Sequence, residues 1–186
     1  IDIKIRLWRE RRYLPQVALG VRDLGGTGLF AGEYLVASKR SGNFDWSLGL
    51  GWGYLGARAD FSNPLYPHRP QEGSVSGGQT NIQSMFHGPI AIFGGVQWQS
   101  PLRPWLLKME LDGSNYKNEP AGRKDLGQKL PLNFGAVYRY GRNTDISIGL
   151  ERGNKIMLGL TFHGNLSQAG TVKPFDPPAP VVSTAM

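Results

Sequence analysis

The chain has 186 residues, 40% of them hydrophobic, which is enough for one domain with a sizeable core and argues against disorder along the whole length. It contains no cysteine, which excludes disulfides, thiolate metal sites and cysteine nucleophiles. The formal net charge of +7 favours an anionic partner such as phosphate, an acidic polysaccharide or acidic lipid, although basic loops that only aid solubility would account for it as well.

Strands are the expected secondary structure from the first residues onward. The chain has 26 glycines and many aromatic residues but no run of about 18 apolar residues, so twisted strands are favoured and a transmembrane helix is excluded. Residues 1–7 alternate Ile and Leu with Asp, Lys and Arg, and residues 17–22 repeat this alternation more weakly. A third strand is expected at residues 29–39.

Residues 44–54 form the clearest segment. Apolar side chains occupy every second position, and aspartate, serine and glycine occupy the positions between them. This period of two predicts a strand with one apolar face, and its length matches the roughly 9–11 residues of a tilted transmembrane strand. The glycines on the other face are expected to leave room for a plug, a loop or a bound chain. The apolar positions are Phe44, Trp46, Leu48, Leu50, Trp52 and Tyr54.

Five further strands follow at residues 90–99, 105–112, 132–140, 146–150 and 156–162. Short connections at 9–14, 40–43, 100–104 and 141–144 alternate with connections at 23–28, 59–88, 113–131 and 152–154, of which 59–88 and 113–131 are long. Short turns at one rim and longer loops at the other are typical of bacterial outer-membrane barrels. We therefore expect an all-β fold, an antiparallel transmembrane β-barrel at residues 1–166, followed by a Pro-rich extended tail at 167–186.

About nine strands are counted, and an odd number does not close as an ordinary even-stranded barrel. The chain is therefore expected to form part of a larger barrel, with further strands before Ile1.

Aromatic residues gather beside the short turns, as expected of rings at a membrane–water interface. We expect the bacterial outer membrane as the location, with the short turns and the tail in the periplasm. The interface candidates are Trp8, Trp46, Trp98, Trp105 and Tyr138 beside the short turns and Trp52 toward the opposite rim.

Basic residues that share the polar parity of the strands are the candidates for binding an anionic solute in the lumen. They are Lys4, Arg6, Arg22, Lys108 and Arg139. The alternative is that they pair with Asp45, Glu110 and Asp145 on neighbouring strands and close the interior with salt bridges.

Catalytic motifs are not found. The glycine-rich segment 25–28 lacks the Lys-Ser/Thr ending of a phosphate-binding loop, and the three histidines have no metal-ligand spacing. Glu110 and Asp112 share a strand face, but no opposing carboxylate is available for glycosidase chemistry. We expect no enzyme activity, no metal, no cofactor and no nucleic-acid partner.

Several segments resemble the YjbH-like family of exopolysaccharide and capsule biosynthesis proteins, which includes GfcD. The similarity covers most of residues 1–166. It rests on residues 13–23, 25–30, 33–40, 42–45 and 48–56, and later on 94–96, 110–113, 118–120, 151–154 and 157–160.

The resemblance implies an outer-membrane β-barrel that assists export or assembly of an extracellular polysaccharide, with other envelope proteins as partners. It carries no established catalytic residues. It also leads us to expect that the early barrel hairpins, the lipid-anchor cysteine and a downstream region lie outside this chain. Two other hypotheses remain: a non-transporting scaffold subunit of an envelope assembly, and a soluble β-sandwich that binds or hydrolyses carbohydrate.

Overall fold

A computed structural model describes residues 1–25, 28–70, 82–102, 104–117 and 128–164. In these ranges nine strands form one antiparallel sheet in which each strand pairs with its neighbours in the sequence. Two short 3-10 helices, η1 (Gly53–Gly56) and η2 (Ile82–Ser84), lie between β4 and β5. The strands are β1 (Ile3–Trp8), β2 (Gln16–Arg22), β3 (Gly32–Ser41), β4 (Phe44–Gly51), β5 (Ala91–Gln99), β6 (Trp105–Leu111), β7 (Leu132–Tyr140), β8 (Thr144–Glu151) and β9 (Lys155–Phe162).

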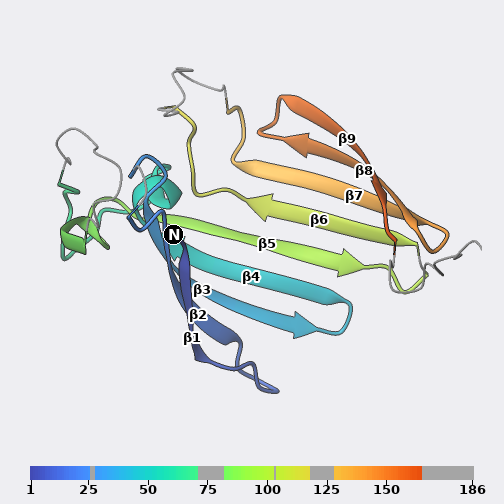
Figure 1. Cartoon of the computed structure of the whole chain (residues 1–186), viewed down its shortest axis with the longest axis horizontal. Coiled ribbons are helices and arrows are strands. Elements are labelled where there is room, and N and C mark those ends of the chain that lie inside the picture. The colour runs from blue at the N-terminus through green and yellow to red at the C-terminus, as the bar shows by residue number, and fades with distance from the viewer. Residues whose placement is uncertain (26–27, 71–81, 103, 118–127, 165–186) are drawn as a thin grey trace, which may run out of the picture.

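The prediction of an all-β fold with nine antiparallel strands is confirmed. Figure 1 shows the sheet as a twisted, curved surface with β1 and β9 at opposite edges, so the described strands do not close into a barrel. The expected Pro-rich tail at 167–186 lies outside the described residues. None of the described helices is long and apolar enough to cross a membrane.

The strand expected at residues 44–54 ends earlier than the alternation indicated. β4 stops at Gly51, and Gly53 takes a positive φ of 61°, which starts η1. Because glycine adopts this left-handed conformation without steric cost, the chain turns here although the apolar parity continues through Trp52 to Tyr54. The strand expected at 29–39 is likewise shifted and occupies Gly32–Ser41.

The strand register gives the sheet one continuous apolar face. Residues directly opposite each other in an antiparallel pair lie on the same side, and Leu35 pairs with Leu50, which pairs with Ile92. The register continues in this way from β4 to both edges of the sheet, β1 and β9, so that the residues on one side can be followed across all nine strands. The apolar face comprises Ile3, Ile5, Leu19, Leu35, Trp46, Leu48, Leu50, Ile92, Val96, Met109, Phe134, Ile148, Leu150, Ile156, Leu158 and Leu160.

The opposite side, the polar face, carries small, polar and charged residues in the same register. It includes Lys4, Arg6, Gly20, Arg22, Tyr34, Ser47, Gly49, Gln97, Lys108, Glu110, Asn133, Gly135, Arg139, Asp145, Ser147, Gly149 and Thr161, and also the apolar residues Val36, Phe93, Leu106, Val137 and Met157. The alternation read from the sequence therefore corresponds to two chemically different surfaces of one sheet.

A β-bulge in β1 changes the side on which Trp8 lies. The register shifts between Arg6 and Trp8, so Arg6 pairs with Ala18 on the polar face whereas Trp8 pairs with Val17 on the apolar face. Without the extra residue, Trp8 would share the side of Arg6. The indole Nε1 donates a hydrogen bond to the Pro15 carbonyl at 3.0 Å.

Connections of two kinds occupy the two rims, as the sequence predicted. The short-turn rim holds the connections β1–β2, β3–β4, β5–β6 and β7–β8, and the long-loop rim holds the described parts of β2–β3, β4–β5, β6–β7 and β8–β9.

Candidate functional site

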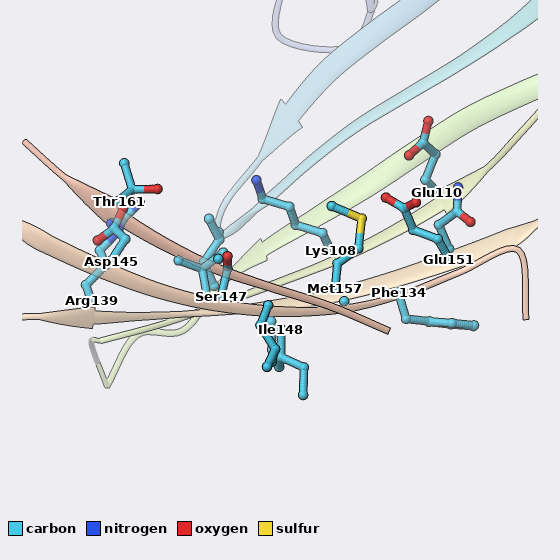
Figure 2. A pocket seen from close by; sticks show the side chains of 18 residues that line it. Lys108, Glu110, Phe134, Arg139, Asp145, Ser147, Ile148, Glu151, Met157 and Thr161 are labelled. Atoms are coloured by element: carbon cyan, nitrogen blue, oxygen red, sulfur yellow. The ribbon is translucent and has the colours of Figure 1, made fainter. Parts of the chain in front are cut away.

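A groove of about 590 Å³ runs over the polar face of β6–β9. Its floor includes Gly135, Gly149 and Gly159, whose missing side chains leave the backbone exposed to the groove. Figure 2 shows Lys108, Glu110 and Glu151 on one side of the sheet, whereas Phe134 and Ile148 point to the other. Charged and hydroxyl groups therefore face the groove, and no aromatic ring does so among the labelled side chains.

Residues of opposite charge occupy neighbouring strand positions at the short-turn rim. Arg139 pairs across the strands with Asp145, whose Oδ2 also lies 3.0 Å from Nε2 of His163. Arg40 and Asp45 form an equivalent cross-strand pair on β3 and β4. Of the five predicted anion-binding residues, Arg139 therefore lies beside a carboxylate.

The other four predicted cations lie opposite uncharged residues. Lys4 pairs with Gly20, Arg6 with Ala18 and Arg22 with Gly32, and Lys108 pairs with Gln97 on one side and Gly135 on the other. None of the four forms an ion pair within the described part of the chain. Arg139 is the register partner of Asp145, but none of the ion pairs among the described residues joins the five cations to Asp45, Glu110 or Asp145, so both interpretations of these cations stay predictions.

Aromatic side chains cover the polar face over β2–β5. A Cβ on Gly20 would lie 2.1 Å from Cζ of Tyr34, and one on Gly49 would lie 2.5 Å from Cζ of Phe93. The Tyr34 and Phe93 rings meet edge to face at 6.1 Å. These glycines leave room for the two rings, and Gly51 does the same for Leu55 of η1.

Loop residues tie the long-loop rim together around Arg58. Its guanidinium bonds the Asp60 carboxylate and donates to the carbonyls of Asp112 and Ile92. The hydrogen bond from Arg58 lowers the pKa of Asp60, and the Asp60 carboxylate in turn raises the pKa of Arg58. Burial and a hydrogen bond to Asp112 raise the pKa of Tyr116.

A second ion pair joins Arg69, in the connection between β4 and β5, to Glu33 at the start of β3. Glu33 is only 2% exposed, and its carboxylate receives two hydrogen bonds from Arg69 at 2.9 and 3.0 Å and one from the Phe86 amide at 3.0 Å. Sequence reasoning missed this pair. The available signal was the carboxylate of Glu33 at an apolar-parity position, but its partner is 36 residues away.

The predicted interface aromatics lie on the apolar face. Trp98 lies 6.5 Å from Phe44, and Trp105 meets Tyr138 edge to face at 4.9 Å, which forms a row along the short-turn rim. Trp46 pairs with Val96 on the same face. Four of the aromatic residues thus lie at the short-turn rim, namely Trp8, Trp98, Trp105 and Tyr138. Trp46 lies further from this rim, at the next same-face position after Phe44 along β4.

Trp52 differs from these residues because it lies at the long-loop rim against Phe86, with ring centroids 5.3 Å apart. Its indole Nε1 is buried without a hydrogen-bond partner among the described residues. A group of three or more metal-ligating side chains is absent from the described part of the chain.

Comparison with known proteins decides the family. A family model named YjbH, described as "Exopolysaccharide biosynthesis protein YbjH", matches residues 1–186. The chain belongs to this family. The resemblance noted from the sequence segments is therefore confirmed.

A relative in Escherichia coli (strain K12), described as "Uncharacterized lipoprotein YjbH", is 49% identical over 176 residues. The match covers 89% of this YjbH-family chain and 24% of the relative, so the chain spans about a quarter of the relative's length. No solved structure shows a significant match.

Proposed function

We propose that this chain forms part of an outer-membrane β-barrel that assists export or assembly of an extracellular polysaccharide. The family supplies the link to exopolysaccharide biosynthesis. The observation that supports the membrane location is the continuous apolar face of the nine-stranded sheet, which no second layer of the described chain covers.

Exposure of the apolar face favours a membrane barrel over a soluble β-sandwich. Leu48 is 55% exposed, Ile148 53% and Leu158 80%, whereas a sandwich would bury such side chains against a second sheet. An exposed apolar surface of this extent requires a partner, and lipid is the partner that accepts it along every strand. The relative's description as a lipoprotein also supports attachment at the envelope.

Closure requires strands beyond those described. β1 and β9 each have one unpaired edge, and an exposed sheet edge is not tolerated in hydrocarbon because its N–H and C=O groups have no water to bond. We propose that further strands of the same longer protein pair with these edges.

Membrane insertion is tested by fractionation of cells that produce the full-length protein. We expect the protein in the outer-membrane fraction, resistant to carbonate and salt washes and extracted only by detergent. Recovery in the aqueous fraction would contradict the proposal. Deletion of the protein should reduce cell-surface polysaccharide, and a membrane-inserted protein without that effect would disprove the export role alone.

A scaffold without transport is the second candidate function. The observation that favours it is the packing of Tyr34, Phe93 and η1 over the polar face of β2–β5, which fills that part of the interior. The cations Lys4, Arg6, Arg22 and Lys108, which lie opposite uncharged residues, instead favour passage of an anionic polysaccharide.

Liposome conductance separates the two functions. A conducting barrel should lose anion preference when Lys4, Arg6 and Arg139 are changed to glutamate, whereas a plugged scaffold should conduct neither before nor after the change. Because Arg139 lies beside Asp145, we expect the single Arg139 change to have the smaller effect.

A further inference from the structure

The turn between β1 and β2 forms a compact basic cluster with the start of the next hairpin. The arginine cluster comprises the exposed Arg9, Arg11 and Arg12 of the turn together with Lys39 of β3, whose ammonium group pairs with Glu10 of the same turn. Lys39 Nζ lies 2.7 Å from the Arg11 carbonyl oxygen and 3.4 Å from Glu10 Oε1. The Arg40 amide donates to the same Glu10 oxygen at 3.2 Å. These bonds hold the turn that carries the three arginines against the end of β3 at the short-turn rim.

The arginines of the two rims are used differently. At the long-loop rim, Arg58 bonds Asp60, Arg69 bonds Glu33, and Arg152 lies 4.9 Å above the Tyr116 ring. At the short-turn rim, Arg9, Arg11 and Arg12 are exposed and form no ion pair within the described residues. The guanidinium groups at the long-loop rim stabilise the fold, whereas those of the arginine cluster are available to a ligand.

Exposed aromatic and apolar side chains adjoin the cluster. Trp8 is 51% exposed and lies on the apolar face because of the bulge in β1, and Tyr13 and Leu14 are 79% and 55% exposed. The Arg12 guanidinium lies 5.2 Å above the Tyr13 ring. Along β1 the surface therefore changes from isoleucine to tryptophan to arginine within a few residues.

This order matches the order of environments through one leaflet of a bilayer. Hydrocarbon accepts aliphatic side chains, the interface accepts indole and phenol rings, and headgroup phosphates accept guanidinium groups in bidentate hydrogen bonds. We propose that the arginine cluster binds the phosphate groups of anionic phospholipids in the leaflet at the short-turn rim. The proposal rests on the proposed membrane location and adds a lipid class and a defined binding site.

An acidic polysaccharide is a less suitable ligand for this site. Lys39 lies on the side of Trp46 and Val96, so the cluster adjoins the apolar face and not the polar face with its groove. A ligand that contacts both the arginines and the neighbouring Trp8 and Leu14 needs an anionic group attached to an apolar body. A phospholipid has this chemistry, and a polysaccharide does not.

The test uses the full-length protein carrying this sequence, purified in a neutral detergent and analysed by native mass spectrometry with added phosphatidylglycerol or phosphatidylcholine. The first variant changes Arg9, Arg11 and Arg12 to glutamine, and the second changes them to lysine. The matched control changes Lys117, Lys129 and Lys155 to glutamine, which removes three exposed positive charges from the long-loop rim.

We expect the unmodified protein to retain phosphatidylglycerol in preference to phosphatidylcholine. The glutamine variant should lose this preference, with affinity falling by roughly fivefold for each arginine removed at low salt. The lysine variant should keep most of it, because the positive charge remains, and the control should behave like the unmodified protein. Salt at about 0.5 M should reduce the preference.

Two results would overturn the lipid site. The first is a glutamine variant that retains phosphatidylglycerol as well as the unmodified protein does. The second is a control, changed at Lys117, Lys129 and Lys155, that loses as much phosphatidylglycerol preference as the glutamine variant. Binding of polygalacturonate oligomers in place of phosphatidylglycerol, with the same loss in the glutamine variant, would overturn it in favour of a saccharide. A membrane-inserted protein with any of these results leaves the barrel proposal intact. A protein that needs no detergent would contradict both proposals.

Discussion

Arg69 binds the buried carboxylate of Glu33 through two parallel hydrogen bonds, with Nη1 to Oε2 at 2.9 Å and Nη2 to Oε1 at 3.0 Å. The pair joins the connection 52–90 to the first residues of β3, and the Phe86 amide adds a third bond to the same carboxylate. It therefore holds a long loop against the sheet at one point.

Removal of Arg69 should release this loop. Arg69→Ala leaves the Glu33 carboxylate buried without its counter-ion, a change that typically costs about 3–5 kcal/mol. We expect faster proteolytic cleavage within residues 52–90 and a lower unfolding temperature. Lys39→Ala breaks a more exposed pair with Glu10 and should cost no more than about 1 kcal/mol. Equal effects of the two changes would contradict the importance assigned to the buried pair.

Acid should weaken the packing around Arg58. Because the hydrogen bond from Arg58 lowers the pKa of Asp60, folding favours the ionised carboxylate. This contribution is complete above the ordinary aspartate pKa of about 4 and is lost as the pH falls through the lower folded value. Thermal unfolding from pH 6 to 2 should show the decline, and Asp60→Asn should flatten it. Glu10→Gln removes a carboxylate at the opposite rim and should leave the decline unchanged.

Glycines under the aromatic rings should not tolerate alanine. In Gly49→Ala the new methyl group would lie 2.5 Å from Cζ of Phe93 and 2.8 Å from the Leu35 carbonyl oxygen, so the ring and the backbone must both shift. We expect a loss of about 1–3 kcal/mol in unfolding free energy, as for other overpacked sites. Gly135→Ala is the matched control on the same face, because its nearest atoms lie at 3.8 Å. A control as unstable as Gly49→Ala would show that strand glycines matter for another reason.

Charge on the apolar face should oppose membrane insertion. Leu48→Arg places a guanidinium in the middle of β4, where a lipid-facing arginine costs about 2–4 kcal/mol near the bilayer midplane. Folding yield in phospholipid vesicles should therefore fall. Ser47→Arg introduces the same side chain one residue away on the polar face, and we expect a much smaller decrease. The reverse ranking would mean that the two faces have been assigned to the wrong environments.

Much of this architecture follows from local patterns in the sequence. Alternation at Phe44–Leu50 and Ile156–Phe162 identified strands and their faces, because side-chain direction in a strand depends only on position parity. The alternation of short and long connections identified the two rims for the same local reason.

Other features depend on contacts between distant parts of the chain, and local patterns did not reveal them. The bulge at Trp8 is a property of pairing between β1 and β2. The Glu33–Arg69 pair joins residues whose separation in sequence is 36. Parity also could not tell which cations lie beside carboxylates, since that requires the register of Arg139 with Asp145.

The strand order β1 to β9 in the sheet has a consequence for how the protein assembles. Each strand needs only the preceding one as its template, so most loops that must close are short and the entropic cost of each step is small. A chain of this design can therefore form one hairpin after another. The connections β4–β5 and β6–β7 are the exceptions, and because the β4–β5 connection is the longer of the two, the addition of β5 to β4 should be the slowest step of assembly.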